Sequence, residues 1–290
     1  MKIRTVLGDI DPGQLGVCDA HDHLFLRSPR LPGEELDDPA AAAAQLRAFA
    51  HLGGRALAQW TPHGMGRRLN DLADISRATG VHVIAATGLH QSVHYDPALL
   101  DGIRPDELFM DELTHSRAGM IKVATAFHGL DDHARRVMTA AAEASNATGA
   151  PIGVHLEQGT SALDVLDLLC GALGVPPSRV ILGHLNRSPD PWIHRRAAES
   201  GAYLAFDGPS RAHHATDWHL FESLTELLDA GYTDRLLLGG DTTTAGARAE
   251  LGVPHVLRAL RPRVERQLGP EAATAIFITN PARAFAAPWS

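Results

Sequence analysis

The chain has 290 residues, a formal net charge of −8 at pH 7 and two cysteines. This length suits one α/β barrel or two smaller domains, and a single barrel domain over residues 1–290 is the simpler interpretation. Lys and Arg are scattered rather than gathered into a basic block, which argues against nucleic acid or a membrane surface as a partner. Two cysteines are too few for a disulfide framework, so we expect Cys18 and Cys170 to be buried, inert thiols.

The N-terminal residues, Met1 to Thr5, lack the apolar core of a signal peptide. No uncharged apolar run approaches the roughly 18 residues that a helix needs to span a bilayer. We therefore expect a protein of the cytoplasm.

Short β-rich runs alternate with longer helical patterns along the chain, as is typical of a parallel sheet with helical crossovers. The predicted strands are 17–23, 55–60, 82–87, 120–126, 152–157, 179–185, 202–207 and 235–241. The predicted helices are 40–50, 69–79, 105–117, 131–148, 161–173, 191–200, 217–230 and 253–268. Several of these helices are followed by glycine, as at Gly80 and Gly149, which suits a left-handed C-terminal cap before the next strand.

Eight strands of this kind close a (β/α)8 TIM barrel, here with a short N-terminal extension. The structural alternative is an open, doubly wound sheet. Neither GxGxxG nor GxxxxGK[ST] follows any predicted strand, so nucleotide-phosphate binding of those kinds has no support and the barrel is favoured.

The first predicted strand ends in His21-Asp22-His23. Alternate side chains of a strand share one face, so both imidazoles could reach one metal ion, for which neutral imidazole is the commonest protein ligand. Taken alone, this pair could equally be two incidental histidines at a strand end. Cys18 is three residues before His21, so we expect it to face the opposite side of the strand and not to be a ligand.

Further ligand-type residues lie at other predicted strand ends, where the active sites of such barrels are found. These residues are His155 on strand five, His184 on strand six and Asp241 on strand eight. Lys122 lies inside the apolar run of strand four, where an ionisable side chain is costly to bury. Carboxylation of this lysine would let it bridge two metal ions; alternatively, it faces the helices and extends to solvent.

With these residues in this order, the chain resembles the phosphotriesterase-like family of the amidohydrolase superfamily, especially its lactonase-type members. The motifs that carry the resemblance are CDAHDHL at 18–24, VIAATG at 83–88, AGMIKV at 118–123, GAPI at 149–152, GH at 183–184, GGD at 239–241 and TNPAR at 279–283. They occur in the expected order over nearly the whole chain.

The resemblance implies a binuclear metal site. In it, His21, His23 and Asp241 bind the more buried ion, His155 and His184 bind the more exposed one, and carboxylated Lys122 and a hydroxide bridge the two. Zinc is the first expectation, with manganese, cobalt or iron as alternatives. The bridging hydroxide would attack the substrate, and Asp241 would accept its proton. Relatives of this type are often homodimers, which makes a homodimer possible here.

The loops favour a small-molecule lactone or carboxylic ester as the substrate, because segments 183–191 and 201–208 resemble those of lactonase-type members. Relatives that use phosphorylated sugar lactones grip the phosphate with basic side chains after strands seven and eight. Here Arg211 follows strand seven, but the loop after strand eight has no base before Arg248. A phosphotriester hydrolase and a catalytically weak metal- or ligand-binding barrel remain the alternative functions.

Several side chains that follow closely on strand ends are candidates for substrate contacts, or else exposed loop residues. These candidates are Arg187, His90, His94, Tyr95, His128 and Arg211.

Overall fold

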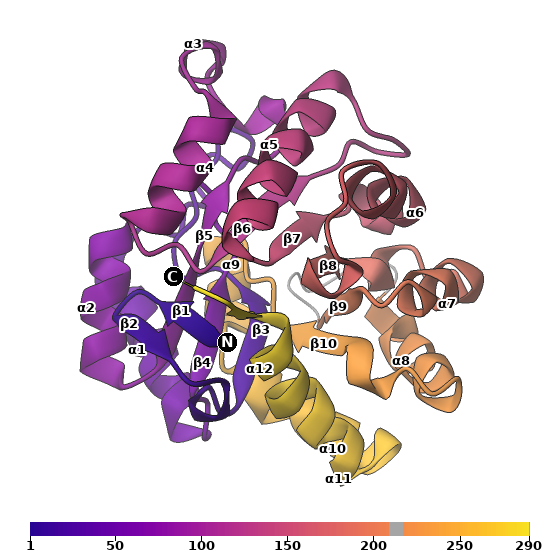
Figure 1. The fold of residues 1–290 in the computed structure, drawn as a ribbon. Coiled ribbons are helices and arrows are strands. Elements are labelled where there is room, and N and C mark those ends of the chain that lie inside the picture. The colour runs from indigo at the N-terminus through magenta and orange to yellow at the C-terminus, as the bar shows by residue number, and fades with distance from the viewer. Residues whose placement is uncertain (209–216, 290) are drawn as a thin grey trace.

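Eight parallel strands form the centre of the molecule, and helices surround them (Figure 1). The computed structural model describes residues 1–208 and 217–289. The strands are β3 (Cys18–Asp22), β4 (Ala56–Gln59), β5 (His82–Gly88), β6 (Met120–Ala124), β7 (Ile152–His155), β8 (Val180–Gly183), β9 (Tyr203–Asp207) and β10 (Leu236–Gly239). They pair in chain order from β3 to β10, which confirms the predicted (β/α)8 barrel.

The helices alternate with these strands, largely as predicted. They are α1 (Pro39–His51), α2 (Leu69–Thr79), α3 (Pro97–Asp101), α4 (Pro105–Thr114), α5 (Asp132–Thr148), α6 (Ala162–Leu166), α7 (Pro191–Glu199), α8 (Leu220–Asp229), α9 (Ala245–Glu250), α10 (Arg261–Leu268), α11 (Pro270–Thr274) and α12 (Asn280–Ala284). The predicted helices 161–173 and 253–268 are each interrupted, because a π-helical turn occupies Asp167–Ala172 and another occupies Val256–Leu260. The short helices α3, α9, α11 and α12 were not predicted.

Helix boundaries follow from local chemistry in the way the sequence indicates. The Asp131 side chain accepts a hydrogen bond from the Ala134 amide and so caps the start of α5. That helix ends at Gly149, with φ of 82°, and α2 ends in the same way at Gly80, with φ of 70°. Glycine adopts this left-handed conformation without a Cβ clash, which lets the chain turn from each helix into the next strand.

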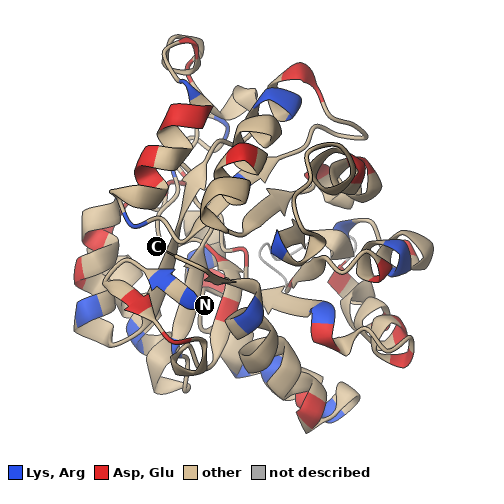
Figure 2. Ribbon diagram, viewed as in Figure 1, with Lys and Arg blue, Asp and Glu red and all other residues tan. Residues whose placement is uncertain are grey.

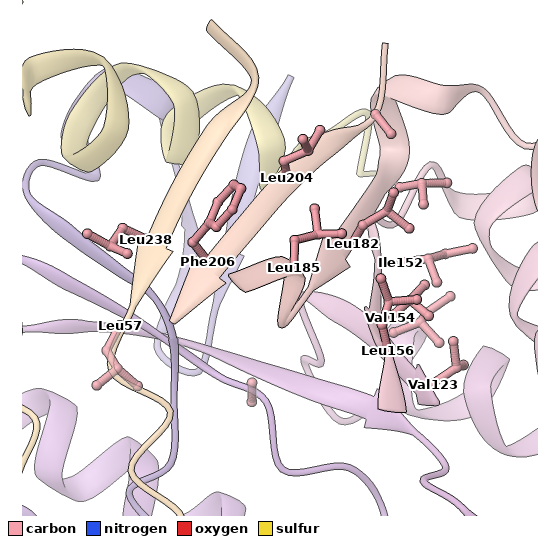
Figure 3. Packing of buried hydrophobic residues seen from close by; sticks show 14 of the residues in the cluster. Leu57, Val123, Ile152, Val154, Leu156, Leu182, Leu185, Leu204, Phe206 and Leu238 are labelled. Atoms are coloured by element: carbon pink, nitrogen blue, oxygen red, sulfur yellow. The ribbon is translucent and has the colours of Figure 1, made fainter. Parts of the chain in front are cut away.

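The strands are apolar on both faces because each face packs against a different layer. The buried apolar residues form two clusters, an outer one between the strands and the helices and an inner one inside the barrel. In β10, Leu236 and Leu238 belong to the outer cluster, which also contains helix residues such as Leu224. Leu237 belongs to the inner cluster, together with the fully buried Trp60. Figure 3 shows several side chains of the outer cluster along neighbouring strands. Burial on both faces explains why these strands read as continuous apolar runs rather than alternating ones.

The N-terminal extension closes one end of the barrel. Strands β1 (Lys2–Thr5) and β2 (Gly8–Ile10) form an antiparallel hairpin, and β1 also pairs with β11 (Ala286–Ala287), so the two chain ends lie close together (Figure 1). Ile3 is fully buried in the inner cluster beside Phe285. The extension therefore contributes to the core of the barrel.

Charged residues of both signs are spread over the outer helices (Figure 2). Among the residues that the structure describes, no helix has the length and apolar character needed to cross a bilayer.

A buried carboxylate ties α4 to the end of β5. Glu112 accepts hydrogen bonds from the Arg67 guanidinium and from the Thr87 hydroxyl, and its Oε1 lies 2.8 Å from Nδ1 of His63. Burial alone would raise the pKa of Glu112, but His63, Arg67 and Thr87 together lower this pKa to about 2. Since Thr87 lies within β5, this network holds the strand end that leads into the cavity described below.

Replacing Glu112 with Gln should destabilise the fold by roughly 2 to 3 kcal/mol near neutral pH, because the partly buried Arg67 loses its counter-charge. The pKa of Glu112 lies below its usual value of 4.5, so its stabilising contribution is complete above that value and is lost as pH falls toward about 2. Urea unfolding at about pH 7 and about pH 3 should therefore give a smaller difference between Glu112→Gln and the parent at the lower pH.

The matched control is Glu107→Gln, an exposed position on the same helix whose ion pair with Arg104 is at the surface. We expect this control to change stability by less than about 0.5 kcal/mol. A Glu112→Gln effect that is equal at both pH values would contradict the assigned role.

Candidate active site

A cavity of about 360 Å³ opens at the carboxyl ends of the barrel strands. Its lining combines residues from the ends of β3, β5, β6, β7, β8 and β10. The lining residues are His21, His23, Leu26, Ser28, Arg30, Leu31, Pro62, Met65, His90, Gln91, Val93, His94, Lys122, His155, Glu157, Gln158, Arg187, Asp241 and Thr243. Five of the six predicted metal ligands are among them: His21, His23, Lys122, His155 and Asp241. The sixth, His184, lies outside this lining, but its Nε2 is 2.7 Å from Nδ1 of His155.

His21, His23 and Asp241 form a compact, buried group. The Nε2 atoms of both histidines lie 3.4 Å from Oδ1 of Asp241. The His21 ring stacks on Trp60 with 3.9 Å between the ring centroids, and Nδ1 of His23 lies 2.7 Å from the Thr61 hydroxyl. Each imidazole is thus held from its far side, and its Nε2 points toward the carboxylate.

The strand that carries these histidines differs from the prediction in two ways. β3 ends at Asp22, so His23 lies just beyond it, and the pairing of β3 with β4 shifts register between Asp19 and Asp22. Cys18 lies in the inner cluster that contains Trp60, the ring on which His21 stacks. The expectation that Cys18 faces away from the histidines was therefore wrong, because the register shift breaks the simple alternation of faces.

Both cysteines are free thiols, and burial raises the pKa of each. Cys18 is fully buried and its Sγ donates to the backbone oxygen of Asp19 at 3.3 Å. Cys170 is only partly buried, and its pKa is raised to about 11. Thiols with raised pKa values are poor nucleophiles, as expected for inert side chains.

Asp241 and His184 both lie beyond the strands in which they were predicted. β10 ends at Gly239 and β8 ends at Gly183. Asp241 has φ of 53° and His184 has φ of 67°, and this left-handed conformation turns the chain out of the parallel ladder. Such backbone is uncommon outside glycine and is concentrated at functional sites.

The seam between β3 and β10 fixes the position of Asp241. The two strands are the edges of the sheet, and the Asp241 amide donates to the His21 carbonyl at 2.9 Å. The Gly240 amide donates to the Asp19 carboxylate at 3.3 Å, and the Thr242 amide donates to the Asp22 carboxylate at 2.9 Å. Side chains of the histidine strand therefore set the backbone on both sides of Asp241.

His155 and His184 form the second part of the site. Nδ1 of His155 lies 2.7 Å from Nε2 of His184. Nδ1 of His184 makes a short hydrogen bond with Oδ2 of Asp207, whose Oδ1 lies 3.0 Å from Nδ1 of His21. Asp207 thus contacts two of the candidate ligands. Sequence reasoning missed this residue, although it is the last residue of a correctly predicted strand.

The protonation states in the cavity suit metal binding. Burial lowers the pKa of His23 and of His155, and it lowers the pKa of His184 to about 4, so these imidazoles are neutral at neutral pH. Burial alone would raise the pKa of Asp241, but the neighbouring His184, Arg187 and His21 hold this pKa well below its usual range.

Lys122 is 3% exposed, and burial lowers its pKa to about 7. The ligand atoms of His21, His23 and Asp241 lie within 4.8 Å of one another. Imidazole nitrogens and an ionised carboxylate at this spacing are a donor set that fits a divalent metal ion.

Some of the predicted substrate-contacting residues line the cavity and others do not. Arg187 lines the cavity and forms an ion pair with Oδ2 of Asp241, and His90 also lines the cavity. Tyr95 and His128 lie outside the described lining: the Tyr95 hydroxyl accepts from the His90 amide at 2.8 Å, and His128 is exposed beside Phe127. His94, which also lines the cavity, stacks on His90. Arg211 lies outside the described residues.

The phosphotriesterase family matches residues 1–285. The chain belongs to this family. A phospho-furanose lactonase of Mycoplasmopsis synoviae is 31% identical over 267 residues, which cover 82% of this chain and 75% of the relative. A lactonase from Listeria monocytogenes has a similar structure, with a TM-score of 0.90, 26% identity and 99% of each chain covered.

A mutant of an organophosphorus hydrolase from Deinococcus radiodurans is also similar, with a TM-score of 0.87 and 27% identity over 99% of this chain and 98% of that one. Members of the family are binuclear metal enzymes, and the His and Asp groups described above could bind metal. This phosphotriesterase-family protein is a metal-dependent hydrolase of small molecules.

Asp207→Asn should weaken metal binding, because the Nδ1 atoms of His21 and His184 would both lose their carboxylate partner. Loss of such a contact typically lowers metal affinity roughly 10- to 100-fold. Competition between zinc-loaded protein and a chromogenic chelator would measure this change. Asp234→Asn is the control, since that carboxylate pairs with Arg235 away from the cavity. If the two variants release zinc equally, Asp207 does not have this role.

Proposed function

We propose that this protein is a metal-dependent lactonase or carboxylic-ester hydrolase that works as one barrel domain over residues 1–290. The main support is the convergence of His21, His23, His155, Lys122 and Asp241 on one cavity of about 360 Å³, with His184 bonded to His155 beside it. That volume lies in the range of small-molecule sites. The similarity to two proteins named as lactonases favours a cyclic ester as the substrate.

We infer that the cavity holds two divalent ions. His21, His23 and Asp241 would bind one ion, His155 and His184 would bind the other, and carboxylated Lys122 would be shared between them. The lowered pKa of Lys122 supports carboxylation, because an uncharged amine is the form that reacts with carbon dioxide to give a carbamate. Mixed nitrogen and oxygen ligands suit zinc first, and also manganese, cobalt or iron.

When bound, such ions supply an activated water and polarise the carbonyl oxygen of the substrate. Asp241 remains ionised at neutral pH and faces the cavity, so its carboxylate can accept the proton of the attacking water and pass it to the leaving oxygen. Arg187 holds this carboxylate through its ion pair and places a positive charge beside the position where negative charge develops.

The cavity wall offers both apolar and polar surface to the rest of the substrate. Leu26, Leu31 and Met65 contribute apolar area, whereas Gln91 and Gln158 carry amides that can bond to hydroxyl or carbonyl groups. A lactone ring with one apolar and one polar edge fits such a lining better than an aryl phosphotriester with several bulky apolar arms. Phosphotriester hydrolysis is therefore the second candidate activity.

Matched panels of γ- and δ-lactones, sugar lactones and aryl phosphotriesters would test the substrate class on zinc- or manganese-loaded protein. We expect kcat/KM for the best lactone to exceed that for the best phosphotriester by about 100-fold or more, or about 2.7 kcal/mol in transition-state binding. The reverse order would favour the phosphotriesterase. No turnover with either panel, at metal occupancy near two ions per chain, would instead indicate a binding protein.

Lys122→Ala should abolish activity and lose the shared ligand, with partial rescue by a short carboxylic acid that replaces the carbamate. The sequence makes this test unusually clean, because Lys2 and Lys122 are the only lysines of the chain. Lys2 is exposed and pairs with Asp11 at the surface, so Lys2→Ala is the control. With ¹³C-labelled bicarbonate, a carbamate resonance should survive in Lys2→Ala and vanish in Lys122→Ala. Full activity with both ions in Lys122→Ala would contradict the assignment.

A further inference from the structure

We propose that Glu157 is a positioning residue that orients the His155 ring toward the second metal position; this inference rests on the proposed function. Oε2 of Glu157 lies 3.0 Å from Nε2 of His155, while Nδ1 of the same ring lies 2.7 Å from Nε2 of His184. The two nitrogens of His155 therefore face different partners. A carboxylate that accepts from the Nε2 hydrogen leaves the lone pair on Nδ1, the atom that faces His184.

The same arrangement occurs, with the nitrogens exchanged, on the neighbouring ring. His184 gives Nδ1 to the Asp207 carboxylate and turns Nε2 toward His155. Each of the two rings thus has a carboxylate on its outer nitrogen and directs its other nitrogen to the space between the rings. Two independent carboxylates, Asp207 at the end of β9 and Glu157 after β7, produce this pattern, in which the outer nitrogen of each ring faces a carboxylate as it does in metal-bound histidines.

Glu157 is itself held from the two preceding strands. Nε2 of Gln91, which follows β5, donates to Oε2 of Glu157 at 2.9 Å and to the Thr125 carbonyl at 2.8 Å. The Thr125 hydroxyl, just after β6, accepts from the Glu157 amide at 2.9 Å. Contacts to both the backbone and the carboxylate fix the side chain, so it can hold the His155 ring in one orientation.

The two carboxylates differ in exposure, which gives Glu157 a separate role from Asp207. The Glu157 side chain is 27% exposed and lines the cavity, whereas the Asp207 side chain is 3% exposed. Asp207 also contacts His21, so it acts on both parts of the site. Glu157 contacts only His155 among the candidate ligands of the described chain, so its removal should affect one metal position and leave the other intact.

The test compares Glu157→Ala, Glu157→Gln and the control Glu143→Ala in zinc-loaded protein, with zinc release to a chelator as the readout. Glu143 is an exposed glutamate on α5 that does not line the cavity. We expect Glu157→Ala to weaken one of the two ions roughly 10- to 100-fold and to leave the other unchanged. Glu157→Gln should recover most of this loss, because its amide oxygen still accepts from Nε2, and Glu143→Ala should release zinc like the parent.

A second readout is the visible spectrum of the cobalt-loaded protein, which reports ligand geometry at each ion. Glu157→Ala should change the band of one ion, and the change should be reversed in Glu157→Gln. The inference would be overturned if Glu157→Ala released both ions like the parent, if it weakened both ions equally, or if it changed only KM. If the parent protein binds two ions and hydrolyses lactones, such results refute only the role of Glu157 and leave the proposed function intact. If the parent protein binds no metal, the proposed function itself is refuted.

Discussion

The buried carboxylate of Asp207 is the contact on which the geometry of the site depends. It joins Nδ1 of His21, near the start of the chain, to Nδ1 of His184, and so holds two imidazoles whose side chains are, like its own, at most 3% exposed. A buried carboxylate needs partners to offset its desolvation, and the rings supply them. The neighbouring pKa shifts follow the same logic. Burial lowers the pKa of His184 to about 4, and although burial would raise the pKa of Asp241, its contacts with His184 and Arg187 hold this pKa well below the usual range.

The closure of the barrel is part of the same construction. β3 and β10 are the edges of the eight-stranded sheet, and between them the Asp19 and Asp22 carboxylates take the amides of Gly240 and Thr242. Side chains thus connect the strand edges at the position where the ligand-bearing loops leave the barrel. The contacts that close the fold also place Asp241, so stability and site geometry are not separable at this seam.

Much of the fold could be predicted from local patterns. The eight apolar runs and the glycines after helices indicated a barrel because each signal depends on residues close in sequence. The boundaries were less accurate, since a strand ends where its ladder ends, and this depends on neighbours from elsewhere in the chain. The left-handed residues His184 and Asp241 and the register shift in β3 are tertiary features, and the prediction for Cys18 failed at that shift.

The sequence by itself determined the chemistry available: histidines, a lysine and an aspartate at strand ends, in an order typical of one family. Only the tertiary structure decided which side chains orient them. No pattern in the sequence distinguishes Asp207 and Glu157 from other acidic residues. Asp207 gains its role because it contacts the imidazole of His184, and Glu157 gains its role because it contacts the imidazole of His155. The tertiary structure also separated His90, which lines the cavity, from Tyr95, which supports it from behind. The end of a strand determines the backbone position of a ligand residue, whereas contacts with neighbouring loops and strands determine the orientation of its side chain.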